Sequence, residues 1–136
     1  MDDVLQTLRI SAAGMKTQGT RLRVIAENIA NADSKATSPG ELPYRRKTAT
    51  FRNVLDRDTG LDLVRVDKIH KDPKPFPKNF DPGHPAADTD GYVLSTNVNS
   101  LIEMSDMREA QRSYEANLNV IKASKAMLNE TIEVLR

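Results

Sequence analysis

The 136-residue chain contains no cysteine and no tryptophan, and only 4% of its residues are aromatic. The absence of cysteine excludes a disulfide framework, a thiolate metal site and a cysteine nucleophile. The shortage of aromatic residues leaves little material for a large globular core. The formal net charge of +1 argues against a dedicated nucleic-acid-binding protein, which normally carries a clear basic excess.

Long apolar runs are missing as well. No stretch approaches the roughly 18 consecutive apolar residues of a transmembrane helix. The N-terminal stretch MDDVLQTLRISAAGM is acidic at its second and third positions, and it lacks the apolar segment of a cleavable secretory signal. We therefore expect that any export of the protein leaves its N-terminus uncleaved.

Residues 3–31 form a heptad pattern that predicts a long helix with a helical partner. One series of mostly small residues recurs every seven positions from Leu5, and a series of larger residues does so from Leu8. Gly14 and Gly19 each cost about 1 kcal/mol of helix propensity relative to alanine, so the helix is marginal alone. The residues predicted to pack against other helices are Leu5, Leu8, Met15, Leu22 and Ile29.

Residues 98–135 carry a second heptad stripe, flanked by a row that contains Met104, Leu118 and Ile132. Another row, at positions 110, 117, 124 and 131, is small or polar. A helix of this length, nearly 60 Å at about 1.5 Å per residue, is too long for a compact globule of this mass. The predicted packing residues are Met107, Tyr114, Ile121, Leu128 and Leu135.

The middle of the chain has a different character, because all seven prolines lie between Pro39 and Pro85. The stretches YRRKTATF and LDLVRVDKI, and the shorter DGYVL, predict strands, whereas KDPKPFPKNFDPGHP excludes a helix. The predicted fold is mainly α with a small β insert, and its two long helices pair as a coiled coil. The predicted organisation is an N-terminal core helix (residues 1–32), a central β-rich and proline-rich segment (33–97) and a C-terminal core helix (98–136).

Candidate metal sites are weak. ADTDGYVLSTNV places Asp88, Asp90 and Gly91 at the third, fifth and sixth positions of a calcium loop, but Ala86 and Asn97 replace both anchoring carboxylates. A polar turn explains the stretch better. The two histidines, at positions 70 and 84, lack zinc-site spacing. We predict no metal, no cofactor and no catalytic residue, and hence no enzyme.

A basic cluster at Arg45, Arg46 and Lys47 stands beside Tyr44 and Phe51. Such a cluster can stack on single-stranded nucleic acid. Acidic residues follow closely, however, so we favour an exposed strand whose basic side chains pair with acidic neighbours, or a protein partner. Those acidic residues are Asp56, Asp58 and Asp62.

Several motifs, in order along nearly the whole chain, resemble the bacterial flagellar basal-body rod protein family, and within it the proximal rod class. They are AENIANADS, PYRRK, DPGHPAADTDGYV, NVN and EMSDMREAQRSYEANLNVIK. The residues that carry the resemblance are Asn28, Asn31, Ala32, Tyr44, Arg45, Arg46, Asp81, His84, Pro85, Asp88, Gly91, Tyr92, Asn97, Asn99, Tyr114, Glu115 and Asn117.

The resemblance implies a structural subunit that polymerises through its terminal helices into the periplasmic drive shaft, transmits torque and continues the export channel. It implies self-association, contacts with other rod proteins, the rod-base adaptor and the membrane ring, and type III export without a cleaved signal. It also implies that Asn28 and Asn31 cap the corner after the first helix. The alternative is a soluble coiled-coil adaptor that forms a discrete small oligomer.

Overall fold

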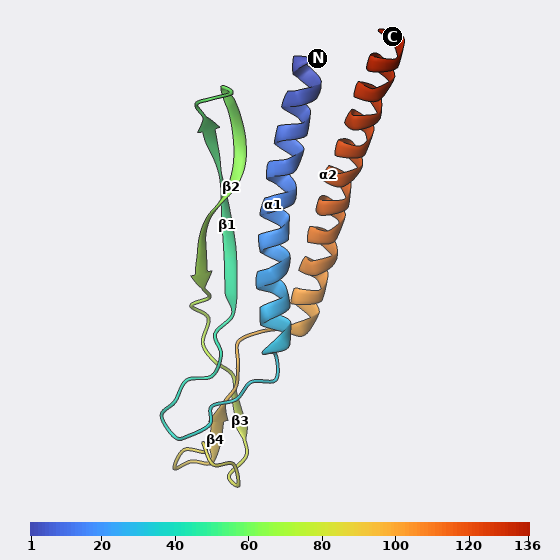
Figure 1. Cartoon of the computed structure of the whole chain (residues 1–136). Helices are drawn as coiled ribbons and strands as arrows, with labels where there is room; N and C mark the ends of the chain where they lie inside the picture. The colour runs from blue at the N-terminus through green and yellow to red at the C-terminus, as the bar shows by residue number, and fades with distance from the viewer. The chain divides into compact units, whose positions relative to one another are not determined.

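The computed structural model describes residues 1–136. Two long terminal helices flank a β-rich middle in the sequence, which confirms the mainly α class with a small β insert. Neither helix combines the length and hydropathy needed to cross a bilayer. The elements are α1 (Asp2–Ala30), β1 (Lys47–Asp56), β2 (Leu61–Lys71), β3 (Lys78–Phe80), β4 (Tyr92–Leu94) and α2 (Ser100–Val134) (Figure 1).

The helix ends follow from local hydrogen bonding. Asp2 and Asp3 lie in the first turn of α1, where carboxylates favour the helix dipole. At the other end, the backbone N–H of Asn31 donates to the Glu27 carbonyl at 3.2 Å, and the Asn31 side-chain amide donates to it at 2.8 Å. The Oδ1 of Asn99 accepts the N–H of Leu101 at 3.1 Å and caps the start of α2.

The strands form two two-stranded sheets, β1–β2 and β3–β4. The first sheet and β4 confirm the three strands predicted from the sequence. The short strand β3 was not predicted, because three prolines precede it and its three residues give no alternating pattern. It pairs antiparallel with β4, with Asn79 opposite Val93.

The chain divides into two compact units. The first unit contains Met1–Leu22, Ala49–Lys68 and Arg108–Arg136. The second unit contains Arg23–Thr48 and Ile69–Met107. Each unit therefore takes part of both helices and part of the β1–β2 hairpin.

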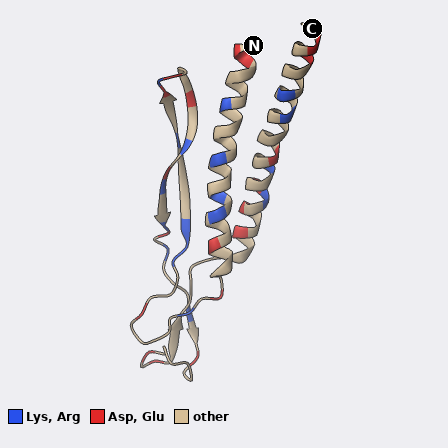
Figure 2. Ribbon diagram, in the orientation of Figure 1, with Lys and Arg blue, Asp and Glu red and all other residues tan.

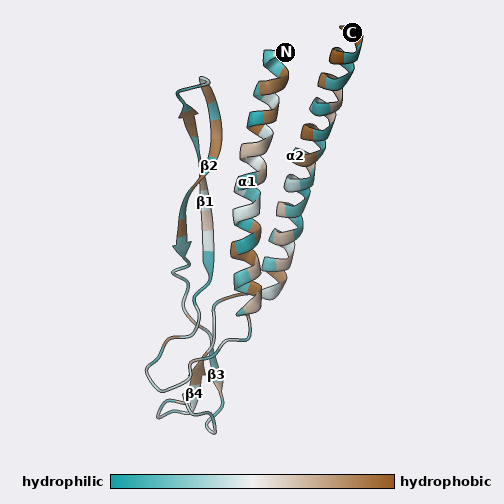
Figure 3. Ribbon diagram, viewed as in Figure 1, coloured by the Kyte–Doolittle hydropathy of each residue, from teal (hydrophilic) through white to brown (hydrophobic).

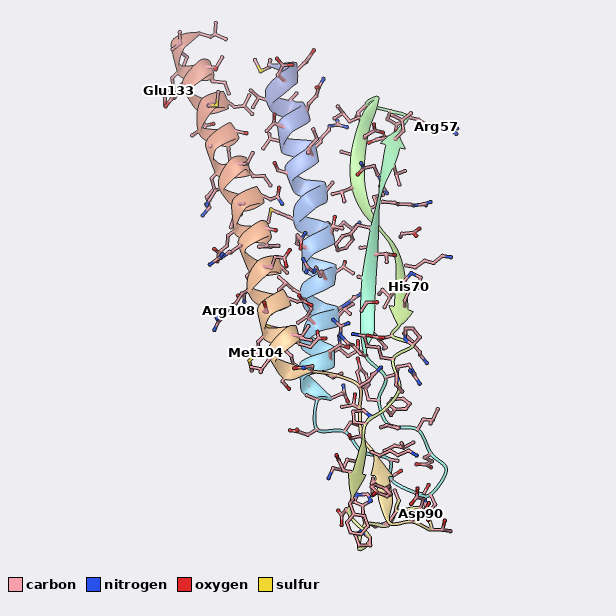
Figure 4. All side chains as sticks on the ribbon, turned by 180° about the vertical axis from the view of Figure 1, so that it is seen from behind. Arg57, His70, Asp90, Met104, Arg108 and Glu133 are labelled. Atoms are coloured by element: carbon pink, nitrogen blue, oxygen red, sulfur yellow. The ribbon has the colours of Figure 1, made fainter.

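In the first unit, α1 lies between the hairpin and α2, as views from both sides show (Figures 1 and 4). The two helices approach closely at Gly14, where an added Cβ would lie 2.7 Å from Nδ2 of Asn117. Ala110 and Ser124, one heptad to either side of Asn117 on α2, are buried. The row of small and polar residues on α2 is therefore covered within the chain from position 110 to position 124, whereas Thr131 is exposed.

This close approach gives two glycines of α1 opposite expected responses to alanine. Gly19→Ala places a methyl group where no atom lies within 4 Å. It should stabilise the chain by up to about 1 kcal/mol through helix propensity alone. Gly14→Ala gains the same propensity but must displace the Asn117 amide, which donates to the Ser113 carbonyl at 3.0 Å. Urea unfolding should rank Gly14→Ala below Gly19→Ala, and equal stabilisation would contradict the close helix approach.

The core of the second unit is small and partly polar. Its apolar cluster consists of Ala36, Ala86 and Val93, with Ala87 packed against it. The largest fully buried side chains in the molecule are Glu103, Val93 and Asn28. A charged and an amide side chain therefore occupy positions where most domains place apolar residues, and such groups require partners.

Candidate functional site

Asn28, in the last turns of α1, is 1% exposed, and its side-chain amide donates two hydrogen bonds and accepts two. Its Nδ2 donates to the Lys47 carbonyl at 2.7 Å and to Glu103 Oε2 at 3.2 Å. Its Oδ1 accepts the Lys47 N–H at 3.0 Å and the Tyr44 hydroxyl at 2.8 Å. The side chain thus pairs with a backbone segment as a neighbouring strand would, and holds residues 44–47 against the end of α1.

Glu103, in the first turn of α2, is fully buried and forms an ion pair with Arg46. The Arg46 guanidinium also pairs with Asp72 at 3.2 Å and with Asp106 at 3.4 Å. Burial lowers the pKa of Arg46, but the hydrogen bonds and charges of Glu103 and Asp72 outweigh it and raise that pKa above its usual value. One guanidinium therefore joins three carboxylates from two parts of the chain.

Asn97 and Asp72 extend this arrangement through the backbone. The Oδ1 of Asn97 accepts the Arg46 N–H at 2.7 Å, and its Nδ2 donates to the carbonyls of Asp72 and Lys74 at 3.2 and 3.1 Å. The Lys74 N–H donates to the Asp72 carboxylate at 2.9 Å. This hydrogen bond and the Arg46 charge hold the pKa of Asp72 below its usual value, although burial opposes them.

We call the set Asn28, Arg46, Asp72, Asn97 and Glu103 the polar clasp. It joins the end of α1, the start of β1, the segment after β2 and the start of α2 within the second unit. Its polar groups hydrogen-bond to one another and to backbone, so the clasp positions chain segments and offers no free nucleophile or base to a substrate.

Three residues surround the clasp. Burial and the charges of Glu27 and Glu103 raise the pKa of Tyr44 to about 12, so its hydroxyl stays neutral and donates to Asn28. Lys47 pairs with Glu27 at 2.6 Å. Arg45 donates to the Asp72 carbonyl at 2.8 Å, and its guanidinium carbon lies 4.2 Å from the centre of the Phe76 ring.

The basic cluster therefore does pair with acidic residues, but the partners that we expected for it were wrong. Asp56, Asp58 and Asp62 lie at the far end of the hairpin, near its turn. Arg46 and Lys47 precede or begin β1, next to the ends of the two helices. Their partners come from α1, from α2 and from the segment after β2.

The motif at residues 81–92 builds a compact polar turn. Asp88 Oδ1 accepts the N–H groups of Asp90 and Tyr92 at 3.0 and 2.8 Å, and His84 Nδ1 accepts the Ala86 N–H at 3.0 Å. The Asp81 N–H donates to the Gly91 carbonyl at 2.9 Å. These bonds match the polar-turn interpretation of the stretch; Asp90 lies at the exposed tip of this loop (Figure 4).

Gly91 is required by this turn for two reasons. Its φ is +85°, and an added Cβ would lie 3.0 Å from the Phe80 ring and 3.1 Å from Pro82. We expect Gly91→Ala to cost about 1–2 kcal/mol from the left-handed conformation alone. The matched control is Gly83→Ala, whose nearest atom is 3.9 Å away and whose φ is not positive. Amide exchange in β3 and β4 should accelerate only in Gly91→Ala; equal protection in both variants would contradict this account.

The residues predicted to pack against other subunits lie along both helices and are incompletely covered by the chain itself. Leu5 and Leu135 are exposed, and the other eight are half-buried. The flanking residues Met104 and Ile132 are also exposed; Figure 4 labels Met104. Apolar residues occur along the whole of α2 (Figure 3). Acidic and basic residues both occur along α2, whereas the acidic residues of α1 lie near its two ends and the basic ones between them (Figure 2).

Sequence reasoning missed Glu103 and Asp72, the two acids of the clasp, both of which are buried. One signal could have identified Glu103. The small and polar row at positions 110, 117, 124 and 131 extends one heptad backwards to Glu103, which places this acid on the buried face. Asp72 gave no comparable signal, because its partners are distant in sequence.

The chain matches two protein-family models. One, described as flagella basal body rod protein, covers residues 8–34, and the other, flagellar basal body rod FlgEFG protein C-terminal, covers residues 89–134. Three relatives are each described as flagellar basal-body rod protein FlgC. The protein of Agrobacterium fabrum is 49% identical over 136 residues, covering 100% of this chain and 98% of its own. That of Yersinia enterocolitica is 38% identical (95% and 96%), and that of Bacillus subtilis is 34% identical (94% and 95%).

Proposed function

Because the chain belongs to the family of flagellar basal-body rod proteins and is a structural rod subunit rather than an enzyme, we propose that it polymerises through its terminal helices into the proximal rod. Membership of the family implies self-association and contact with other basal-body components. In this proposal the helices of neighbouring copies form the inner wall of the shaft by coiled-coil packing. Residues 33–97 face outward.

The observation that supports this proposal is that different faces of α2 are buried within the chain and left uncovered. Within the chain, α2 buries its small and polar row, including Ala110 and Ser124. Its large apolar residues Ile121 and Leu128 remain half-buried, and Leu135, directly after the helix, is exposed. Burying such side chains contributes about 1.5–3 kcal/mol each, and here that contribution is available to contacts with other subunits.

We further propose that the assembled subunit lies in the periplasm, transmits torque and lines the export channel. Its partners would then be other rod proteins, the rod-base adaptor and the membrane ring, and the flagellar type III apparatus would export it with no cleaved signal. Exposed ion pairs are worth about 1 kcal/mol or less each, so torque would be carried by many repeated contacts rather than by a few strong ones.

The second candidate, a discrete coiled-coil adaptor, rests on the same heptad pattern. In it the apolar heptad residues pack within a small closed oligomer instead of a growing rod. Far-ultraviolet circular dichroism and sedimentation of the purified chain, from high to low micromolar concentration, separate the two. A rod subunit should lose helix content on dilution and show no fixed small oligomer, because its helices order on assembly. Full helix content in a constant dimer or trimer would favour the adaptor and overturn assembly-coupled ordering.

A further inference from the structure

In the first unit, α1 and the hairpin enclose an open groove of about 520 Å³. Its apolar lining comes from Ala12 and Ala13 of α1 and from Leu63, Val64 and Val66 of β2. The Thr17 hydroxyl lies 3.4 Å from the Val64 carbonyl, and both Thr17 and Leu63 are buried. The hairpin is thus fixed against α1, and the groove is a formed feature of the unit.

Three residues that line this groove are basic. Arg9, Lys16 and Arg65 line it, against the single acid Asp56. None of the three cations forms a salt bridge within the chain, whereas the Asp56 carboxylate already accepts the Asp58 N–H at 3.1 Å. The groove therefore suits a segment that is apolar on one face and acidic.

The last turns of α2 have this chemistry. Met127, Thr131 and Val134 lie on one helical face with Glu130 between them, and Glu133 lies nearby. Met127 and Val134 are 57% and 86% exposed, although apolar side chains that lie together are usually covered. Neither glutamate forms a salt bridge within the chain.

We propose that the groove between α1 and the hairpin receives the C-terminal turns of α2, residues 127–134, from a second copy of the chain. Within one molecule the contact is blocked, because α1 lies between the hairpin and α2 in this unit (Figures 1 and 4). Met127 and Val134 cover the apolar residues of the groove, and Glu130 and Glu133 pair with its three cations.

This contact joins two different surfaces of the subunit, so it does not close on itself as a two-fold dimer would. Repeated from copy to copy, it generates an open helical assembly or a ring. The inference rests on the proposed function and adds to it the two surfaces by which successive copies connect.

The absence of cysteine from the chain allows a direct test by cross-linking. The full-length chain carrying Ala12→Cys and Thr131→Cys replaces the native copy in cells, and basal bodies are isolated and mildly oxidised. We expect a ladder of disulfide-linked multiples of the chain on denaturing electrophoresis. The single-cysteine variants, and Thr131→Cys combined with Asn53→Cys on the exposed part of β1 outside the groove, should stay monomeric.

Charge reversal supplies the second arm. Adding Glu130→Lys and Glu133→Lys to the double-cysteine chain should abolish the ladder, and further adding Lys16→Glu and Arg65→Glu should restore it. Basal bodies that contain the chain without a ladder would overturn the inference and leave the proposed function standing. A cross-link to a protein of different mass would also overturn it, since another subunit would then occupy the groove. Absence of the unmodified chain from basal bodies would instead contradict the proposed function.

Discussion

Arg46→Met is expected to lower the free energy of unfolding of the second unit by about 3–5 kcal/mol, the usual cost of removing one partner from a buried ion pair. Glu103 is fully buried, and its carboxylate would keep only the Asn28 amide as a side-chain partner. Amide exchange at Lys47 and Asp72, whose N–H groups donate to Asn28 Oδ1 and to the Arg46 carbonyl, reports the opening of this unit directly.

Two further variants separate this effect from a general loss of positive charge. Arg52→Met breaks an ion pair with Asp67 in which the side chains are 65% and 36% exposed, so it should cost less than about 1 kcal/mol. Arg46→Met combined with Glu103→Leu removes both charges of the most buried pair and should recover part of the stability, whereas Asp72 still loses its Arg46 partner. If Arg46→Met and Arg52→Met have equal effects, the clasp does not hold the unit together.

Leu128→Asp is expected to prevent incorporation of the subunit into the rod. Leu128 is only half-buried within the chain, so the free subunit should tolerate the carboxylate. In an assembled coiled coil the same position would lose about 1.5–3 kcal/mol of apolar burial, and a buried unpaired charge adds several kcal/mol more. Because every subunit repeats the loss, assembly should fail; immunoblots of isolated basal bodies measure it.

Asn129→Asp is the matched control, since it adds the same charge at the neighbouring exposed position. It should enter rods normally. Leu8→Asp, Leu22→Asp and Ile121→Asp should behave like Leu128→Asp. Normal rods containing the Leu128→Asp variant would show that this stripe does not face other subunits, whereas equal helix content of the Leu128→Asp and Asn129→Asp chains would exclude misfolding as the cause of exclusion.

The long helices and three of the strands could be predicted because their signals are local. Heptad spacing identified α1 and α2 to within two residues at their ends, and runs of β-branched residues identified β1 and β2. The strand β3 escaped prediction because its pairing with β4 depends on residues brought together by the intervening turn. Pairing partners over such distances are a property of the fold, which a window of sequence does not contain.

The polar clasp was predictable only in part. Asn28, Tyr44, Arg46 and Asn97 were singled out through the family resemblance, but nothing in their spacing indicated that they meet. Asn28 and Arg46 both contact Glu103, which is 75 and 57 residues away in sequence. A fully buried glutamate in the first turn of a helix has the same sequence signature as an exposed one that favours the helix dipole. Burial is what separates the two cases, and it depends on the tertiary structure.

The exposed leucines, isoleucines and methionines of α2 also affect how the free subunit behaves before it is assembled. Leu101, Ile102, Met104 and Met127 are between 49% and 78% exposed, so the free subunit presents large apolar side chains of α2 to water. Such a surface binds other apolar surfaces without selectivity at sufficient concentration. A cell that synthesises this chain therefore has to keep its free concentration low, or shield α2 with another protein, during the interval between the ribosome and the growing structure.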